Sequence, residues 1–272
     1  MLIDFHTHVF PEKIAEKTIK ILEDMSDGKA CTDGTVAGLF RQMEKGGADI
    51  AVALPVVTKP SQFESITEFA RKINEDFYLK GKGILSFGGI HPRCEDIKGK
   101  MKTLKELGFS GVKIHPDYQD AFIDDEGYIE ILKAAKDLDM IVVTHAGVDD
   151  GYIGKPVKCP PELALKVIKK IGHEKLVLGH YGGHKLWEDV YDKLAGENVY
   201  FDTAFTFHEI DKELFIKILN KHGADRVLFA TDCPWRDIKE DGDILMSYNL
   251  SDEVNEKIFY KNAEKLLKIK VK

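Results

Sequence analysis

Short apolar stretches alternate with amphipathic stretches along almost the whole chain. Eight of the apolar stretches have the length and composition of strands that are buried on both faces. They cover Leu2–His6, Ile50–Val56, Gly83–Ile90, Gly111–Ile114, Met140–Thr144, Lys175–Gly179, Val199–Asp202 and Val227–Thr231. The stretches between them repeat apolar residues at helical spacing, as Leu214, Ile218 and Leu219 do. This order predicts a parallel sheet that is covered by helices.

The number of strands and the length of the chain together favour an α/β fold of the (β/α)8 TIM-barrel type. Such a barrel typically needs about 250 residues, and this chain has 272. No Pro/Ser-rich stretch and no run of like charges marks a linker. We therefore expect residues 1–272 to form a single domain, with a helical insertion over about 11–46 and a C-terminal helix over about 251–268.

Histidines and one aspartate recur where the predicted strands end. They are His6, His8, His91, His115, His145, His180 and Asp232. His6 and His8 are two residues apart on one strand, so they point to the same side. In a barrel the carboxyl ends of all the strands meet at one opening, so residues distant in sequence come together there. The pattern predicts a metal site at that opening, since imidazole and carboxylate are usual ligands of divalent transition metals.

The proposed ligands are His6, His8, His145 and Asp232, which come from strands one, five and eight. Three or four protein ligands with a bound water are typical of a catalytic zinc site, so we expect one divalent ion, with zinc as the first choice. Such an ion lowers the pKa of bound water to about 7 and supplies hydroxide at neutral pH. We assign His180 as general acid and base, with Asp232 as the alternative proton shuttle.

Four further residues are candidates for substrate binding. Lys113 and His115 share one face of the fourth strand. Lys113 is either a carboxylated bridge to a second metal or, as we favour, a structural ion pair or a contact to a substrate carboxylate; His115 is an extra ligand or a substrate contact. Arg93 and Arg236 follow strands three and eight, where a guanidinium would bind a carboxylate.

The remaining histidines have an ordinary interpretation. His173, His184, His208 and His222 fall on predicted helices or helix ends, and we interpret all four as surface or packing residues.

Composition narrows the location and the partners of the protein. The chain has 39 basic and 46 acidic residues, a net charge of −7, which disfavours nucleic acid as a partner. No stretch resembles a signal peptide or a membrane span, so we expect a cytoplasmic protein without a membrane partner. Four scattered cysteines are interpreted as reduced bystander thiols, although Cys94 and Cys233 adjoin strand ends.

Several motifs, taken in order, resemble the amidohydrolase superfamily. They are Asp4-Phe-His6-Thr-His8, Gly111-Val-Lys113-Ile-His115-Pro, Thr144-His145-Ala-Gly, Leu178-Gly-His180-Tyr-Gly-Gly and Ala230-Thr-Asp232-Cys-Pro-Trp235. The chain is most similar to the branch that contains aminocarboxymuconate semialdehyde decarboxylase. The resemblance implies the same four metal ligands and His180 as the catalytic histidine. It leaves the metal count open at Lys113, and we favour one ion.

Four functions are compatible with these residues. The leading interpretation is hydrolysis of a small amide, ester or lactone by metal-bound hydroxide. The alternative is non-oxidative decarboxylation or hydration of a small unsaturated carboxylic acid. A nuclease is disfavoured by the acidic charge and by Lys113 and His115, where that family would carry a glutamate. A non-catalytic barrel that only binds a metal or a partner is disfavoured, because the proposed ligand set lies beside His180, the proposed general acid and base. A homodimer is compatible with either enzyme.

Overall fold

Parallel β-strands occupy all eight predicted strand positions in the structure, a computed structural model that describes residues 1–26 and 28–270. The third position is divided at Phe87 into two short strands. The strands are β1 (Ile3–Thr7), β2 (Ile50–Ala53), β3 (Gly83–Ser86), β4 (Gly88–Gly89), β5 (Gly111–Ile114), β6 (Ile141–Thr144), β7 (Leu176–Leu178), β8 (Tyr200–Asp202) and β9 (Val227–Leu228).

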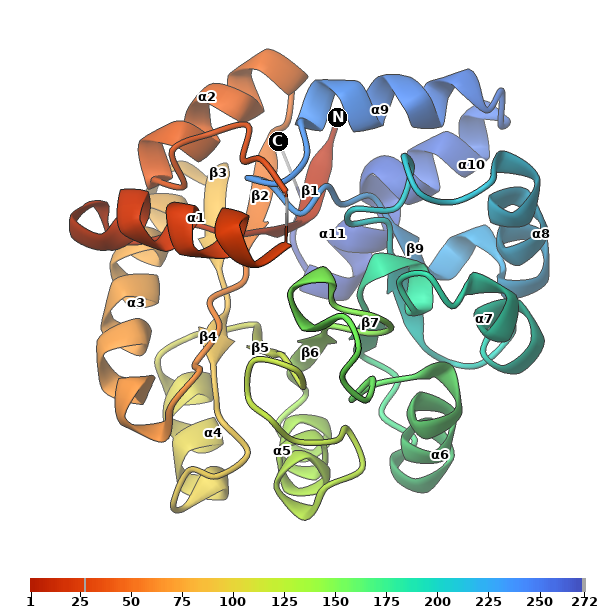
Figure 1. Ribbon diagram of the computed structural model, residues 1–272. Coiled ribbons are helices and arrows are strands. Elements are labelled where there is room, and N and C mark those ends of the chain that lie inside the picture. The colour runs from red at the N-terminus through yellow and green to blue at the C-terminus, as the bar shows by residue number, and fades with distance from the viewer. Residues whose placement is uncertain (27, 271–272) are drawn as a thin grey trace.

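The strands close into a barrel. Pairing follows chain order within two sheets, β1-β2-β3 and β4 to β9. The last strand returns to the first: the Phe5 N–H donates to the Phe229 carbonyl over 2.9 Å, and Thr7 forms a parallel bridge with Cys233. Helices surround the ring of strands in Figure 1. The predicted (β/α)8 TIM barrel is therefore confirmed.

Helices α1 to α8 lie between strands, with two of them between β1 and β2, and α9 to α11 follow β9. They are α1 (Glu12–Ser26), α2 (Val36–Gly46), α3 (Phe63–Lys80), α4 (Ile97–Glu106), α5 (Glu126–Asp137), α6 (Pro161–Ile171), α7 (Trp187–Lys193), α8 (Lys212–His222), α9 (Ile238–Ser247), α10 (Asp252–Glu256) and α11 (Asn262–Leu267). Short 3-10 turns, among them η2 (Asp150–Tyr152) and η3 (His180–Gly182), lie in the loops. Among the described residues, no helix has both the length and the apolar character needed to cross a membrane.

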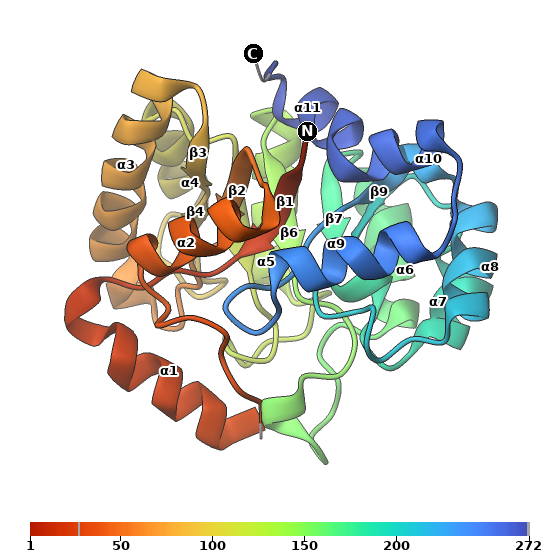
Figure 2. The same cartoon turned by 90° about the horizontal axis from the view of Figure 1, so that it is seen from above.

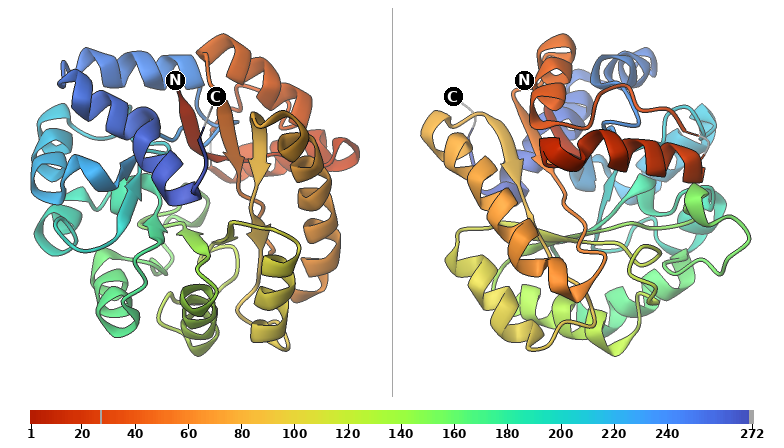
Figure 3. Two further views of the ribbon diagram at one scale, coloured as in Figure 1. Left: turned by 180° about the vertical axis from the view of Figure 1, so that it is seen from behind. Right: turned by 60° about the vertical axis from the view of Figure 1, so that its left-hand side comes forward.

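Two helices lie across the barrel rather than beside it. α1 crosses the front of the barrel in Figure 1 and packs against η2, as the turned view in Figure 2 shows. α11 lies across the back (Figure 3), where Leu266 and Leu267 join the apolar cluster of the barrel interior. The opening at the front is therefore bordered by α1 and by the loops that follow the strands.

Alternate positions of the strands face two different apolar clusters. Val143 and Val177 belong to the interior cluster, whereas their chain neighbours Val142 and Leu178 pack with the surrounding helices. Lys113 pairs in register with Val143, so it too points into the barrel. The period-two alternation of buried strands thus decides which side chains can reach the inside.

β1 departs from this alternation before its histidines. Three steps along β1, from Asp4 to Thr7, match two steps along β2, which is a β-bulge. Phe5 belongs to the interior cluster, yet His6, the next residue, also faces the interior and lies 2.9 Å from Lys113. The bulge therefore aims His6 into the barrel where a regular strand would aim it at the helices.

Candidate metal centre

Three of the four predicted metal ligands converge at the front opening. One ligand atom each from His6, His8 and Asp232 lies within 4.8 Å of the other two. His8 Nε2 is 3.0 Å and His6 Nε2 is 3.6 Å from the same Asp232 oxygen, Oδ1. All three side chains are largely buried. Residues from the two ends of the chain thus form a compact nitrogen and oxygen donor set, as a divalent transition metal requires.

The hydrogen bonds of the imidazoles fix their tautomers. The Nδ1 atoms of His8 and His180 lie 2.8 Å and 3.0 Å from the carbonyls of Leu54 and Ala204, and a carbonyl only accepts. Nδ1 of each ring must therefore carry a hydrogen, so in a neutral ring the lone pair is on Nε2. Burial lowers the pKa of His180, so this imidazole is neutral at pH 7.

Asp202 fixes the tautomer of His6 and was not among the predicted site residues. Its Oδ2 accepts a hydrogen bond from His6 Nδ1 at 2.9 Å, and its Oδ1 accepts from the His180 backbone N–H at 3.0 Å. The side chain is fully buried. Asp202 ends β8 just as the other site residues end their strands, so the same strand-end rule applied to a carboxylate would have found it.

Replacing Asp202 with Asn is expected to weaken metal binding by about ten- to a hundredfold, as changes behind a ligand typically do. The amide keeps the shape of the carboxylate but cannot accept at both oxygens, so either His6 Nδ1 or the His180 N–H loses its partner. Chelator competition on the purified variant measures the effect. Asp192→Asn, on the exposed surface of α7, is the matched control, and equal affinities of the two variants would refute the role of Asp202.

His180 stands in the middle of a row of rings across the opening. Its ring centroid is 5.4 Å from that of His6 and 4.6 Å from that of His145. Beyond His145, the rings of His115 and Tyr118 stack at centroid distances of 4.5 Å and 3.9 Å. The row therefore places the neutral imidazole of His180 between His6 on one side and the stacked rings of His145, His115 and Tyr118 on the other.

The backbone is strained at two of the predicted site residues. His180 has φ of 56° and Asp232 has φ of 69°, in the left-handed region that side chains other than glycine rarely adopt. Each such residue costs about 1–3 kcal/mol, and such residues cluster at active sites. The conformation turns both side chains into the opening rather than along the strand.

Asp232 is ionised in this environment. Burial alone would raise the pKa of its carboxyl group, but the hydrogen bond with His8 and the nearby imidazoles lower it to about 2. A permanently charged carboxylate suits a metal ligand better than a proton donor, which favours His180 for proton transfer.

His145, the fourth predicted ligand, lies in a second group. Its ligand atom is within 4.8 Å of those of His115 and Asp149. The Tyr118 N–H donates to His115 Nδ1 at 3.4 Å, which places the hydrogen of His115 on Nε2, 3.5 Å from Asp149 Oδ2. His115 therefore presents a donor to Asp149 rather than a lone pair to an ion. This arrangement favours one ion over two.

Unpaired polar atoms surround this second group. His145 Nε2 and Asp117 Oδ2 are buried 3.9 Å apart, and neither has a hydrogen-bond partner within the described part of the chain. Burial raises the pKa of Asp117 to about 6 and that of Asp149 to about 7. These two aspartates, which sequence reasoning missed, lie in the long loops after β5 and β6.

Lys113 lies at the base of the centre, not at its rim. Its Nζ is 2.9 Å from His6 Nε2, the side chain is 1% exposed, and burial lowers its pKa to about 8. Among the described residues, no carboxylate lies within ion-pair distance of its ammonium group. The sequence favoured two roles for Lys113. The structural ion pair is wrong, whereas a contact to a substrate carboxylate is compatible with the structure.

The two predicted arginines are engaged elsewhere. Arg93 is exposed, and its guanidinium donates to the Asp120 carbonyl over 2.7 Å. Arg236 Nε lies 3.6 Å from the buried carboxylate of Asp241 on α9. Neither has a hydrogen bond or ion pair with the candidate ligands in the described part of the chain. Arg93 is exposed, whereas the Nε and Nη2 atoms of Arg236 are buried beside Asp241. The structure does not bring these predicted substrate contacts into the site.

His184 is also placed differently from its prediction. It lies in the loop after β7 rather than on a helix, is 4% exposed, and its ring centroid is 5.8 Å from that of His180. Its backbone pairs with Gly147, where an added Cβ would come within 2.1 Å of the His184 nitrogen. His184 therefore lies beside His180. Its predicted place on a helix is wrong, whereas the prediction of a packing residue is compatible with its burial.

Comparison with known proteins relates the whole chain to one family. A sequence profile of the amidohydrolase family matches residues 3–269. Gamma-resorcylate decarboxylase from Polaromonas sp. JS666 is 24% identical over 213 residues, which are 62% of this chain and 64% of that protein. The match thus spans less than two thirds of the length of this curated relative.

Solved structures share the fold over nearly their full length. Dihydroxybenzoic acid decarboxylase from Polaromonas sp. JS666, solved with manganese and 2-nitroresorcinol, has a TM-score of 0.73 at 18% identity and covers 98% of this chain and 96% of its own. 5-Carboxyvanillate decarboxylase from Novosphingobium aromaticivorans, also solved with manganese, has a TM-score of 0.72 at 16% identity and covers 99% and 96%. An uncharacterised TIM-barrel protein from Bordetella bronchiseptica reaches 0.75 at 16% identity and covers 98% of both chains.

Proposed function

Because the chain belongs to the amidohydrolase family, we propose that it is a metal-dependent decarboxylase acting on a small unsaturated carboxylic acid. The observation that carries the proposal is the buried ammonium of Lys113, 2.9 Å from His6 Nε2 and without a carboxylate partner among the described residues. An unpaired buried cation attracts an anion. Hydrolysis, the first interpretation of the sequence, receives less support, because the matched relatives of known activity are named as decarboxylases.

The residues present fit one divalent ion. His6, His8 and Asp232 would hold it. His145 lies in the second group, and its buried Nε2 without a hydrogen-bond partner among the described residues supports it as the fourth ligand. When bound, the ion supplies positive charge that orients the oxygen atoms of the substrate and stabilises negative charge as it develops. Zinc and manganese both suit a set of imidazoles and a carboxylate.

The reaction exchanges a carboxylate for a proton. The bond between the carboxyl carbon and the unsaturated carbon breaks, carbon dioxide leaves, and the electron pair of that bond takes up one proton. Lys113 would bind the carboxylate. His180, held by its Nδ1–H, would take up a proton from water at the Nε2 lone pair and pass that proton to the unsaturated carbon. The stacked rings of His115 and Tyr118 would hold the flat part of the substrate.

The test is a substrate panel with two readouts. The protein, loaded with manganese or zinc, is incubated with 2,6-dihydroxybenzoate, 5-carboxyvanillate and other unsaturated acids, and with small amides, esters and lactones. Carbon dioxide release from an acid, equal to the substrate consumed and absent after chelation of the metal, is the expected result. Hydrolysis of an amide, ester or lactone without carbon dioxide release from any acid would contradict the proposal.

A further inference from the structure

Two cysteines from opposite ends of the chain are in contact beside the candidate metal centre. Cys31 lies in the segment between α1 and α2, and Cys233 directly follows Asp232. The Cys31 thiol interacts with the Cys233 thiol, and it donates to the Arg236 carbonyl at 3.3 Å. The Cys31 N–H donates to the Pro234 carbonyl at 2.7 Å. Backbone and side chain therefore hold the two sulfur atoms together.

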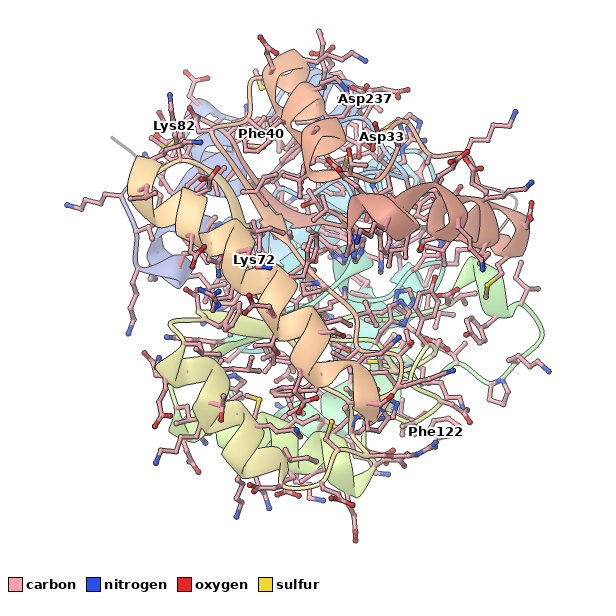
Figure 4. All side chains as sticks on the ribbon, turned by 90° about the vertical axis from the view of Figure 1, so that its left-hand side faces the viewer. Asp33, Phe40, Lys72, Lys82, Phe122 and Asp237 are labelled. Atoms are coloured by element: carbon pink, nitrogen blue, oxygen red, sulfur yellow. The ribbon has the colours of Figure 1, made fainter. Side chains whose placement is uncertain are left out.

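The two thiols differ in their access to solvent. Cys31 is exposed and lines a surface cavity of about 440 Å³ together with Arg41, Gln42 and Lys45. Figure 4 labels Asp33, which also lines this cavity, and Asp237, which pairs with Lys45. Cys233 is 1% exposed. A reagent in solution can therefore reach the thiol of Cys31, whereas the thiol of Cys233 is buried.

The pair is joined to the strand that carries the histidine ligands. The His8 N–H donates to the Cys233 carbonyl at 2.6 Å, and Thr7 forms a β-bridge with Cys233. The Asp232 N–H donates to the His6 carbonyl at 2.8 Å. A displacement of Cys233 is transmitted through these bonds to His8 and, through one peptide bond, to Asp232.

We propose that Cys31 and Cys233 are a redox-active dithiol whose reversible disulfide loosens the hold of the adjacent centre on its divalent ion. The coupling to the ion rests on the proposed function, whereas formation of the disulfide does not. All four cysteines are free thiols in the structure, and the proposal differs from the bystander interpretation in giving Cys31 and Cys233 a redox role.

The chemistry is balanced with hydrogen peroxide as the oxidant. The Cys31 thiolate attacks one peroxide oxygen, the O–O bond breaks, and a sulfenic acid and water form after proton transfer. The Cys233 sulfur then attacks the Cys31 sulfur and a second water leaves, so that two thiols and one peroxide give one disulfide and two waters. The hydrogen bond from Cys233 lowers the pKa of the Cys31 thiol, which increases its thiolate fraction.

The experiment uses the full chain loaded with manganese or zinc. After brief treatment with hydrogen peroxide, peptide mass analysis is expected to find Cys31 linked to Cys233 with the loss of two hydrogen atoms. Chelator competition should show an affinity for the metal that is about tenfold lower, as for other changes behind a ligand. Dithiothreitol should restore both values.

Variants separate the two parts of the proposal. Cys31→Ser and Cys31→Ala should abolish both the crosslink and the effect of peroxide on metal affinity, whereas Cys94→Ser, which changes a buried thiol elsewhere, should leave both in place. Oxidation of Cys31 to a sulfinic acid without a crosslink would overturn the dithiol. A crosslink with unchanged metal affinity would overturn the coupling. Neither readout depends on turnover, so the result is separate from the substrate panel.

Discussion

Replacing Asp232 with Asn is expected to remove the bound ion and to lower turnover by at least about a thousandfold, because the charge that neutralises the ion is lost. Asp232 Oδ1 is the atom towards which His6 Nε2 and His8 Nε2 both point, at 3.6 Å and 3.0 Å. The amide keeps the size of the side chain but loses its charge. Metal analysis should find about one equivalent in the wild-type protein and little in the variant.

Two further variants make this result specific. Asp243→Asn changes an exposed carboxylate on α9 that pairs with Lys239, and it should retain the full metal content. His145→Ala tests the fourth ligand, and its metal content should also fall. If Asp232→Asn bound metal at the wild-type stoichiometry, the proposed centre would be wrong.

Replacing Lys113 with Met is expected to change metal affinity and turnover in opposite directions. At pH 7 most of the Lys113 side chain is protonated, since burial lowers its pKa to about 8 and no further. A unit charge and a divalent ion about 4 Å apart repel by roughly 8 kcal/mol at an effective dielectric of about 20. Relief of about a sixth of that repulsion would raise metal affinity about tenfold.

Turnover of Lys113→Met should nevertheless fall by about a hundredfold or more, because the variant loses the group proposed to bind the substrate carboxylate. Chelator competition and the carbon dioxide assay measure the two effects on one preparation. Lys102→Met, on the exposed face of α4, should change neither value. A loss of metal from Lys113→Met would instead identify Lys113 as part of the ligand set and contradict the proposed role.

The barrel and the convergence of three candidate ligands could be predicted from the sequence for one reason. Buried parallel strands are continuous apolar runs, so their ends can be located to within a few residues, and all strand ends meet at one opening. His6 and His8 therefore had to meet Asp232, although it lies more than two hundred residues further along the chain. What mattered was the position of each residue on its strand.

The residues whose positions were predicted wrongly lie in loops, and the convergence of strand ends gives no information about loops. Arg93, Arg236 and His184 are in loops, and the path of a loop depends on contacts that a single sequence does not reveal. Asp202 ends a strand in the same way, but the predicted ligand set followed the recurring imidazoles and did not include this carboxylate. The two sulfur atoms of Cys31 and Cys233 meet across loops as well, which spacing along the chain could not indicate.

Because of the bulge in β1, the direction of the histidine side chains depends on the number of residues that precede them in the strand. A change of side chain near the start of the chain alters packing by degrees, but the gain or loss of a single residue ahead of His6 would flip its ring, together with that of His8, to the outer surface of the wall. The barrel would still assemble, since apolar residues stand on both sides of the strand. Along this segment, insertions and deletions should therefore be far rarer than substitutions among variants that keep their activity.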